Sequence, residues 1–123
     1  MHNHPSVAEL VQAVKIFVDE TATPNLTGHA AFHARVASNV LATILRDLDA
    51  RPAAEGNERT RLQALLESTE TKLDALNQDL CKRIQSGNMD ARTQGLLEHL
   101  KATTIAQVEV DQPRYSGLAT AKD

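Results

Sequence analysis

Two polar side chains fall on helix faces that the sequence otherwise fills with apolar residues. On a wheel of about 100° per residue, His33 lies within the apolar arc of Val36, Val40 and Ile44. Asn77 holds the same position among the leucines of a later segment. A buried polar group without a partner costs about 1–3 kcal/mol, so both need hydrogen bonds and can supply each other. The pattern predicts either a polar pair that fixes helix register or a ligand pocket lined by His33 and Asn77.

The histidines have one spacing that suits a metal ion. His29 and His33 are four residues apart, so on a helix their imidazoles point the same way. No Glu follows His29, and His2 and His4 complete a cluster only if the N-terminal segment folds over this helix. Two ligands do not make a site. We therefore predict no metal and no cofactor, with His29 and His33 as the weak candidates for ligands.

Nucleophilic catalysis needs a hydroxyl or thiol beside a base and a stabiliser of developing charge. The sequence contains no Gly-x-Ser-x-Gly motif and no glycine-rich phosphate loop. Cys81 stands between Leu80 and Lys82, a setting typical of a small packing residue. The sequence therefore favours a non-catalytic protein, and the enzymatic alternative is a small enzyme that uses His33 as a general base.

Four polar residues are candidates for binding a partner. Arg35 and Asn39 share the side of their helix opposite the apolar arc, where they form either a solvated face or a docking patch for a protein or an anion. Arg114 and Tyr115 follow Pro113 near the C-terminus, and both residue types are common at interfaces. A tail that folds back over the helices explains them equally well.

Composition indicates an all-helical protein. Of 123 residues, 41% are hydrophobic but only 2% are aromatic and none is Trp, so the core must be aliphatic, as in helical bundles. The net charge of −3 argues against nucleic acid as a partner. A single cysteine argues against disulfides and fits a reducing compartment. With no pattern typical of a signal peptide or membrane span, we expect a cytoplasmic location and no membrane association.

The first half of the chain predicts two helices. A capping box that begins at Ser6 starts a helix over about residues 6–20. Turn residues follow, and a second helix is expected over about residues 29–50. Pro52 and Gly56 are expected to close it.

The second half predicts two or three helices. Leucines repeat at helical spacing over residues 57–87, but the polar run 67–71 interrupts them, and we favour a break there with Ser68 as the new cap. A last helix starts near Asp90, and the tail after Pro113 is expected to be extended. The apolar positions of this last helix are Leu96, Leu97, Leu100, Thr104, Ile105 and Val108.

Four or five amphipathic helices joined by short loops can bury their apolar faces only against one another. We therefore predict one all-α domain over residues 1–123, a compact bundle with a tail from about residue 112. An interaction module should expose an apolar or arginine-rich patch, whereas a ligand-binding bundle should hold a cavity of about 300 Å³ or more beside His33. Self-association stays open, because so small a bundle can leave one apolar stripe uncovered.

Three stretches of the chain, residues 4–10, 32–39 and 111–116, together resemble an uncharacterised family of short bacterial helical proteins. Its members are met beside or fused behind aminoglycoside-phosphotransferase-like kinases, often near acyl-CoA dehydrogenases. Residues 76–87 fit as well, whereas members often have a Gly-rich break where this chain has residues 67–71. The resemblance implies an accessory domain that works with such a kinase or dehydrogenase, and it carries over no catalytic residue.

Overall fold

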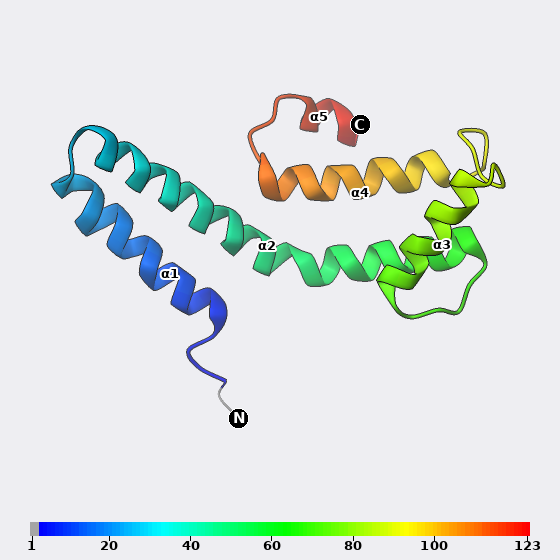
Figure 1. The fold of residues 1–123 in the computed structure, drawn as a ribbon, viewed down its shortest axis with the longest axis horizontal. Helices are drawn as coiled ribbons and strands as arrows, with labels where there is room; N and C mark the ends of the chain where they lie inside the picture. Colours follow the sequence, from blue (N-terminus) through cyan, green and yellow to red (C-terminus); the bar gives the residue numbers. More distant parts are fainter. Residues whose placement is uncertain (1–2) are drawn as a thin grey trace. The chain divides into compact units, whose positions relative to one another are not determined.

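The structure, a computed structural model, describes residues 3–123, and helices dominate it (Figure 1). No strand occurs in this described part, which confirms the all-α class and the expected number of four to five helices. None of its helices is long and apolar enough to cross a bilayer. The α-helices are α1 (Val7–Phe17), α2 (Gly28–Leu66), α3 (Leu73–Gln85), α4 (Leu96–Asp111) and α5 (Gly117–Lys122).

The chain divides into two units, Met1–Ala50 and Arg51–Asp123. The first holds α1 and the N-terminal part of α2, and the second holds the rest of α2 with α3, α4 and α5. A single domain over residues 1–123 stays a prediction.

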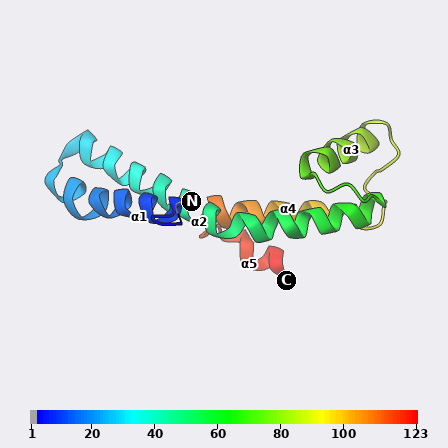
Figure 2. The same ribbon diagram turned by 90° about the horizontal axis from the view of Figure 1, so that it is seen from below.

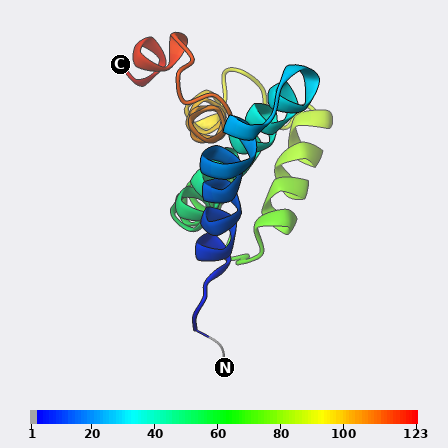
Figure 3. The ribbon, with the colours of Figure 1, turned by 90° about the vertical axis from the view of Figure 1, so that its left-hand side faces the viewer.

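The first unit is a helical hairpin, which begins with the predicted capping box. The Ser6 hydroxyl accepts a hydrogen bond from the Glu9 amide at 3.2 Å, and the Glu9 carboxylate accepts one from the Ser6 amide at 2.6 Å. After α1 the chain continues through a π-helical turn, Val18–Ala22, and a 3-10 turn, Thr23–Asn25. These turns reverse the chain, so that α1 and the first half of α2 lie antiparallel and side by side (Figures 1 and 3).

The second helix does not end where the sequence predicts. It was expected over residues 29–50 with Pro52 beyond its end, but α2 contains Pro52. Proline removes one helical hydrogen bond and costs about 3 kcal/mol in a helix interior. Farther along the same helix, Leu62 and Leu66 are fully buried in the core of the second unit. Their packing offsets the local cost of proline, and the helix therefore continues through it.

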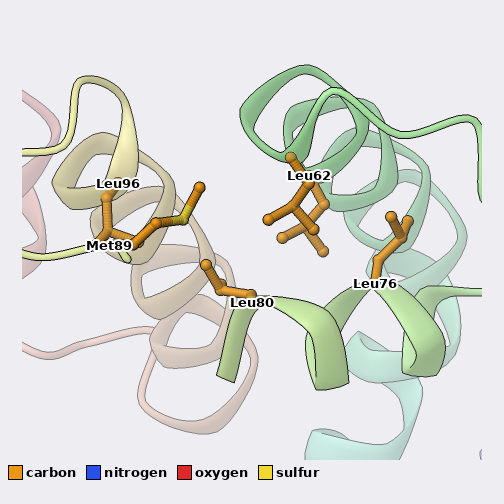
Figure 4. Packing of buried hydrophobic residues seen from close by; sticks show 6 residues of the cluster. Leu62, Leu76, Leu80, Met89 and Leu96 are labelled. Carbon is orange, nitrogen blue, oxygen red and sulfur yellow. The ribbon is translucent and has the colours of Figure 1, made fainter. Parts of the chain in front are cut away.

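The core of the second unit is a small aliphatic cluster in which Met89 fills the space between helices (Figure 4). Arg83 joins α3 to the end of α2 by donating a hydrogen bond to the Leu66 carbonyl at 3.2 Å. Its guanidinium is held in place by two hydrogen bonds, of 3.1 and 2.9 Å, to Asp79 one turn earlier on α3. The buried members of the cluster are Leu62, Leu66, Leu76, Leu80, Met89 and Leu96.

The predicted break at residues 67–71 is confirmed. Glu67 adopts a left-handed backbone with φ of 51°, which ends α2. The proposed cap was wrong, because Ser68 accepts from the Glu70 amide within the loop and Lys72 occupies the N-cap position of α3. The loop is held instead by the Glu70 carboxylate, which accepts from the amides of Thr71 and Lys72 at 2.7 and 2.8 Å.

The apolar face predicted for the last helix was only partly correct. Leu96 is buried, but Leu97 and Leu100 are 55% and 42% exposed, while His99 is buried in their place. Apolar residues surround most of α4, so periodicity alone does not single out the face that packs inward.

The tail prediction was also wrong in part. Residues 112–116 are not helical, but Gly117–Lys122 form α5, which lies along α4 (Figures 1 and 2). Leu118 is buried, and Lys122 forms an ion pair with Glu109 of α4. One apolar anchor and one ion pair therefore fold the tail back.

Candidate functional site

Two exposed apolar stripes dominate the first unit. The exposed apolar residues recur along α1 at steps of three and four and along α2 at every fourth position. Each stripe therefore follows one side of its helix. Every side chain in them is between 39% and 63% exposed. Ala31 is the one apolar residue that is buried among residues 3–50. We call the following set the hairpin surface: Val7, Leu10, Val14, Phe17, Phe32, Val36, Val40 and Ile44.

A polar contact joins the two arms of the hairpin. The Asp19 carboxylate accepts from the Lys15 ammonium at 2.6 Å and from the hydroxyl of Ser38 on α2. The Lys15 ammonium, and after it the Ser38 hydroxyl, hold the pKa of the Asp19 carboxyl below its ordinary value. The Asp19 carboxylate therefore stays ionised at neutral pH, and its hydrogen bond with Ser38 links the end of the first arm to α2.

The second unit places a polar cluster between α2, α3 and α4, in which His99 is buried and the other members are half-buried. His99 is 3% exposed, and its Nδ1 has no hydrogen-bond partner. Burial, and after it the positive charge of Arg61, lower the pKa of the His99 imidazole, and Glu58 opposes them. Arg61 donates to the Thr103 hydroxyl at 3.3 Å, and the Asn77 amide donates to Glu58 at 3.1 Å. The cluster thus holds a neutral imidazole beside an acid and a guanidinium.

An apolar groove of about 370 Å³ lies between α4 and α5. Three polar side chains, those of Lys101, Thr104 and Tyr115, join an otherwise aliphatic lining that includes Leu118. The Tyr115 ring stands over Gly117, where an added Cβ would come within 2.6 Å of the ring. The groove can accept an apolar group and place a polar end near an ammonium and a phenol.

His33 and Asn77 lie in different units and differ in their exposure. His33 is exposed in the first unit, so its predicted burial was wrong; its ring meets Phe32 edge-on with centroids 5.5 Å apart. Its apolar neighbours are on the surface too, and for that reason the helical wheel misplaced it. Asn77 is half-buried in the second unit, where its side-chain amide donates a hydrogen bond to Glu58 and so has the polar partner that we expected it to need. A ligand role for the two stays a prediction.

The other predicted residues lie at the surface. Arg35 and Asn39 are exposed on α2, and Arg114 and Tyr115 are exposed in the connection before α5. His29 is exposed as well. All four candidates for partner binding are therefore accessible within their own units.

No group of three or more His, Cys, Asp or Glu side chains within residues 3–123 is arranged to hold a metal ion. His4 lies 3.2 Å from the Glu9 carboxylate, and His2 lies outside the described residues.

Comparison with known families places this chain in one of them. The model of the domain of unknown function DUF6285 matches residues 24–115, well over half of the chain. The chain belongs to the DUF6285 family. No curated protein and no solved structure matches it.

The DUF6285 match covers the elements unevenly. It contains α2, α3 and α4, and therefore the cluster around the buried His99 and the α2 stripe of the hairpin surface. α1 and α5 lie outside the matched residues. The hairpin surface thus combines a helix inside the DUF6285 match with a helix outside it.

His99 is the site residue that the sequence analysis missed. Leu96, His99, Thr103 and Val110 follow each other at helical steps, a spacing that puts all four on one side of α4. This spacing was visible in the sequence, but the face with Leu97 and Leu100 is more hydrophobic and was therefore the one predicted to be buried.

Proposed function

We propose that this DUF6285 chain is a non-catalytic protein-interaction domain whose hairpin surface is covered by another protein chain. The observation that carries the proposal is the exposure of eight large apolar side chains on one two-helix unit. Apolar patches on monomeric proteins are usually about 300–600 Å² and often functional, and larger ones mark interfaces.

The energetics of the hairpin support the same conclusion. Two helices alone have no interior, and units of this size gain stability from a partner when they lack a core. Val14 and Phe17 are more than half exposed, although burying such side chains contributes about 1.5–3 kcal/mol each. A covering chain therefore stabilises the hairpin while it binds.

The resemblance suggests the working context of this domain. Its relatives lie beside phosphotransferase-like kinases and near acyl-CoA dehydrogenases, so we assign the chain as a cytoplasmic accessory of one of these. Arg35 and Asn39 on the first unit, and Arg114 and Tyr115 on the second, are exposed polar residues that can contact such a kinase or dehydrogenase, each pair from its own unit.

Co-purification tests this function. The tagged chain is expressed with the kinase and the dehydrogenase encoded next to it, and the mass of every assembly that contains the chain is measured. We expect an assembly larger than one chain that Val14→Glu disrupts and Gln12→Glu leaves intact. Gln12 is the matched control, because it is exposed on the same helix and outside the stripe. A wild-type chain that stays monomeric alone and with both proteins would contradict the proposal.

A second candidate function is small-molecule binding in the groove between α4 and α5. The supporting observation is the apolar lining with Lys101 and Tyr115 among it. We expect a short fatty acid to bind there and Leu100→Glu to abolish binding, as titration calorimetry would show. Equal binding by the variant would exclude this groove.

A further inference from the structure

Both arms of the hairpin carry an uncharged seam with coiled-coil spacing. On α1 the steps between Val7, Leu10, Val14 and Phe17 are three, four and three residues. On α2 five residues repeat the steps of three and four without a charged side chain, with His33 as the one polar member. Such seams pack knobs into holes against other helices. The α2 seam consists of Ala30, His33, Ala37, Val40 and Ile44.

The two seams lie on the same side of the hairpin. On α1 the half-buried Val11, Lys15 and Val18 mark the side that faces α2, and on α2 the less exposed Ala31 and Ser38 mark the side that faces α1. At about 100° per residue, the α1 seam is displaced from its contact side by about a quarter turn and the α2 seam by about a third of a turn, in the same rotational sense. For antiparallel right-handed helices, displacement in the same sense brings both seams to one side.

The size of the uncovered surface matches that of a protein interface. The residues of the two seams expose together on the order of 700 Å² per chain, against about 800 Å² per partner in an interface of standard size. Two copies would therefore bury an area within the range of stable complexes.

We propose that the occupant of this surface is a second copy of the same chain, so that two hairpins form an intermolecular four-helix bundle. This rests on the proposed function and names its first partner. Two antiparallel helices with seams on one side are half of such a bundle, and a second copy supplies the other half with the same spacing. Because the seams lack charges, a copy adds no unpaired charge, whereas a charged partner surface would lose hydration without compensation.

Sedimentation of the full-length chain alone, over about a hundredfold range of concentration, tests this proposal. We expect twice the mass of one chain for the wild type. Val14→Glu places a carboxylate in the seam of both copies and should raise the dissociation constant of the dimer by about tenfold or more. Gln12→Glu adds the same charge outside the seam and should leave the constant unchanged. Circular dichroism confirms that both variants keep their helices.

Any other outcome contradicts the proposal that a second copy of the chain covers this surface. A wild-type chain that is monomeric throughout the range, or a dimer that Val14→Glu does not weaken, contradicts it. If the monomeric chain forms a complex with the kinase or the dehydrogenase that Val14→Glu disrupts, the proposed function stands and only the occupant is wrong. If it forms none, both proposals fail.

Discussion

At the scale of single residues, the folded structure disfavours protonation of the His99 imidazole. The imidazole is buried beside the Arg61 guanidinium, and its pKa is lowered from the ordinary value of about 6.5. The unfolded chain therefore binds a proton more readily than the folded chain does. Stability from this group is complete above about pH 6.5 and falls as the pH drops towards the folded pKa.

Thermal unfolding measured between about pH 7.5 and 5.5 tests this linkage, because one proton changes the free energy of unfolding by up to about 1.4 kcal/mol per pH unit. We expect the wild type to lose stability as the pH falls, and His99→Gln to flatten that slope. His29→Gln is the control, since His29 is exposed. An unchanged slope in His99→Gln would show that burial of His99 does not govern the pH dependence.

Glu67 carries the one left-handed backbone conformation of a non-glycine residue among the described positions, with φ of 51°. A side chain costs about 1–2 kcal/mol there, and glycine avoids much of that cost. We expect Glu67→Gly to raise the free energy of unfolding by about 1 kcal/mol, as urea denaturation would measure. Glu67→Ala removes the carboxylate but keeps the strain, so equal stabilisation by both variants would assign the effect to charge.

At the scale of elements, Pro52 interrupts the hydrogen bonds of α2 without ending it. Pro52→Ala restores the amide donor to the Leu48 carbonyl, and we expect it to raise the stability by about 1–3 kcal/mol. Denaturant unfolding checks this, with Ala53→Gly as a control that should destabilise the same helix by about 1 kcal/mol. A destabilised Pro52→Ala would mean that α2 does not run through this position in solution.

The small helix α5 is held to α4 mainly by Leu118. We expect Leu118→Ala to lower the free energy of unfolding by about 2 kcal/mol, near the lower limit for buried leucines because the site is at the chain end. Lys122→Ala should cost less than about 1 kcal/mol, since its ion pair with Glu109 is exposed. If Leu118→Ala unfolds like the wild type, α5 does not pack on α4.

At the scale of the whole molecule, local signals predicted local structure well. The capping box at Ser6 depends on a few neighbouring residues, and the structure confirms it. The continuation of α2 through Pro52 depends on leucines ten or more residues away, which a local rule does not see. The existence of the longer helices was therefore predictable, whereas the helix ends set by tertiary packing and the short helix α5 were not.

The candidate site shows the same division. The apolar stripes of the hairpin were visible as helical periodicity, but periodicity does not tell whether a stripe faces a core or another molecule. His33 was expected inside for that reason and lies outside, whereas His99 was overlooked and is buried.

The central claim is that the hairpin surface is covered by protein in solution. Its most direct test is the rate at which a thiol reagent modifies Val14→Cys, with Gln12→Cys as the exposed reference, both in a Cys81→Ser background that removes the exposed native thiol. We predict that Val14→Cys reacts about tenfold more slowly and slows further as the protein is concentrated, because association protects it by mass action. Equal rates for the two cysteines at every concentration, both for the chain alone and with the kinase and the dehydrogenase added, would contradict the claim.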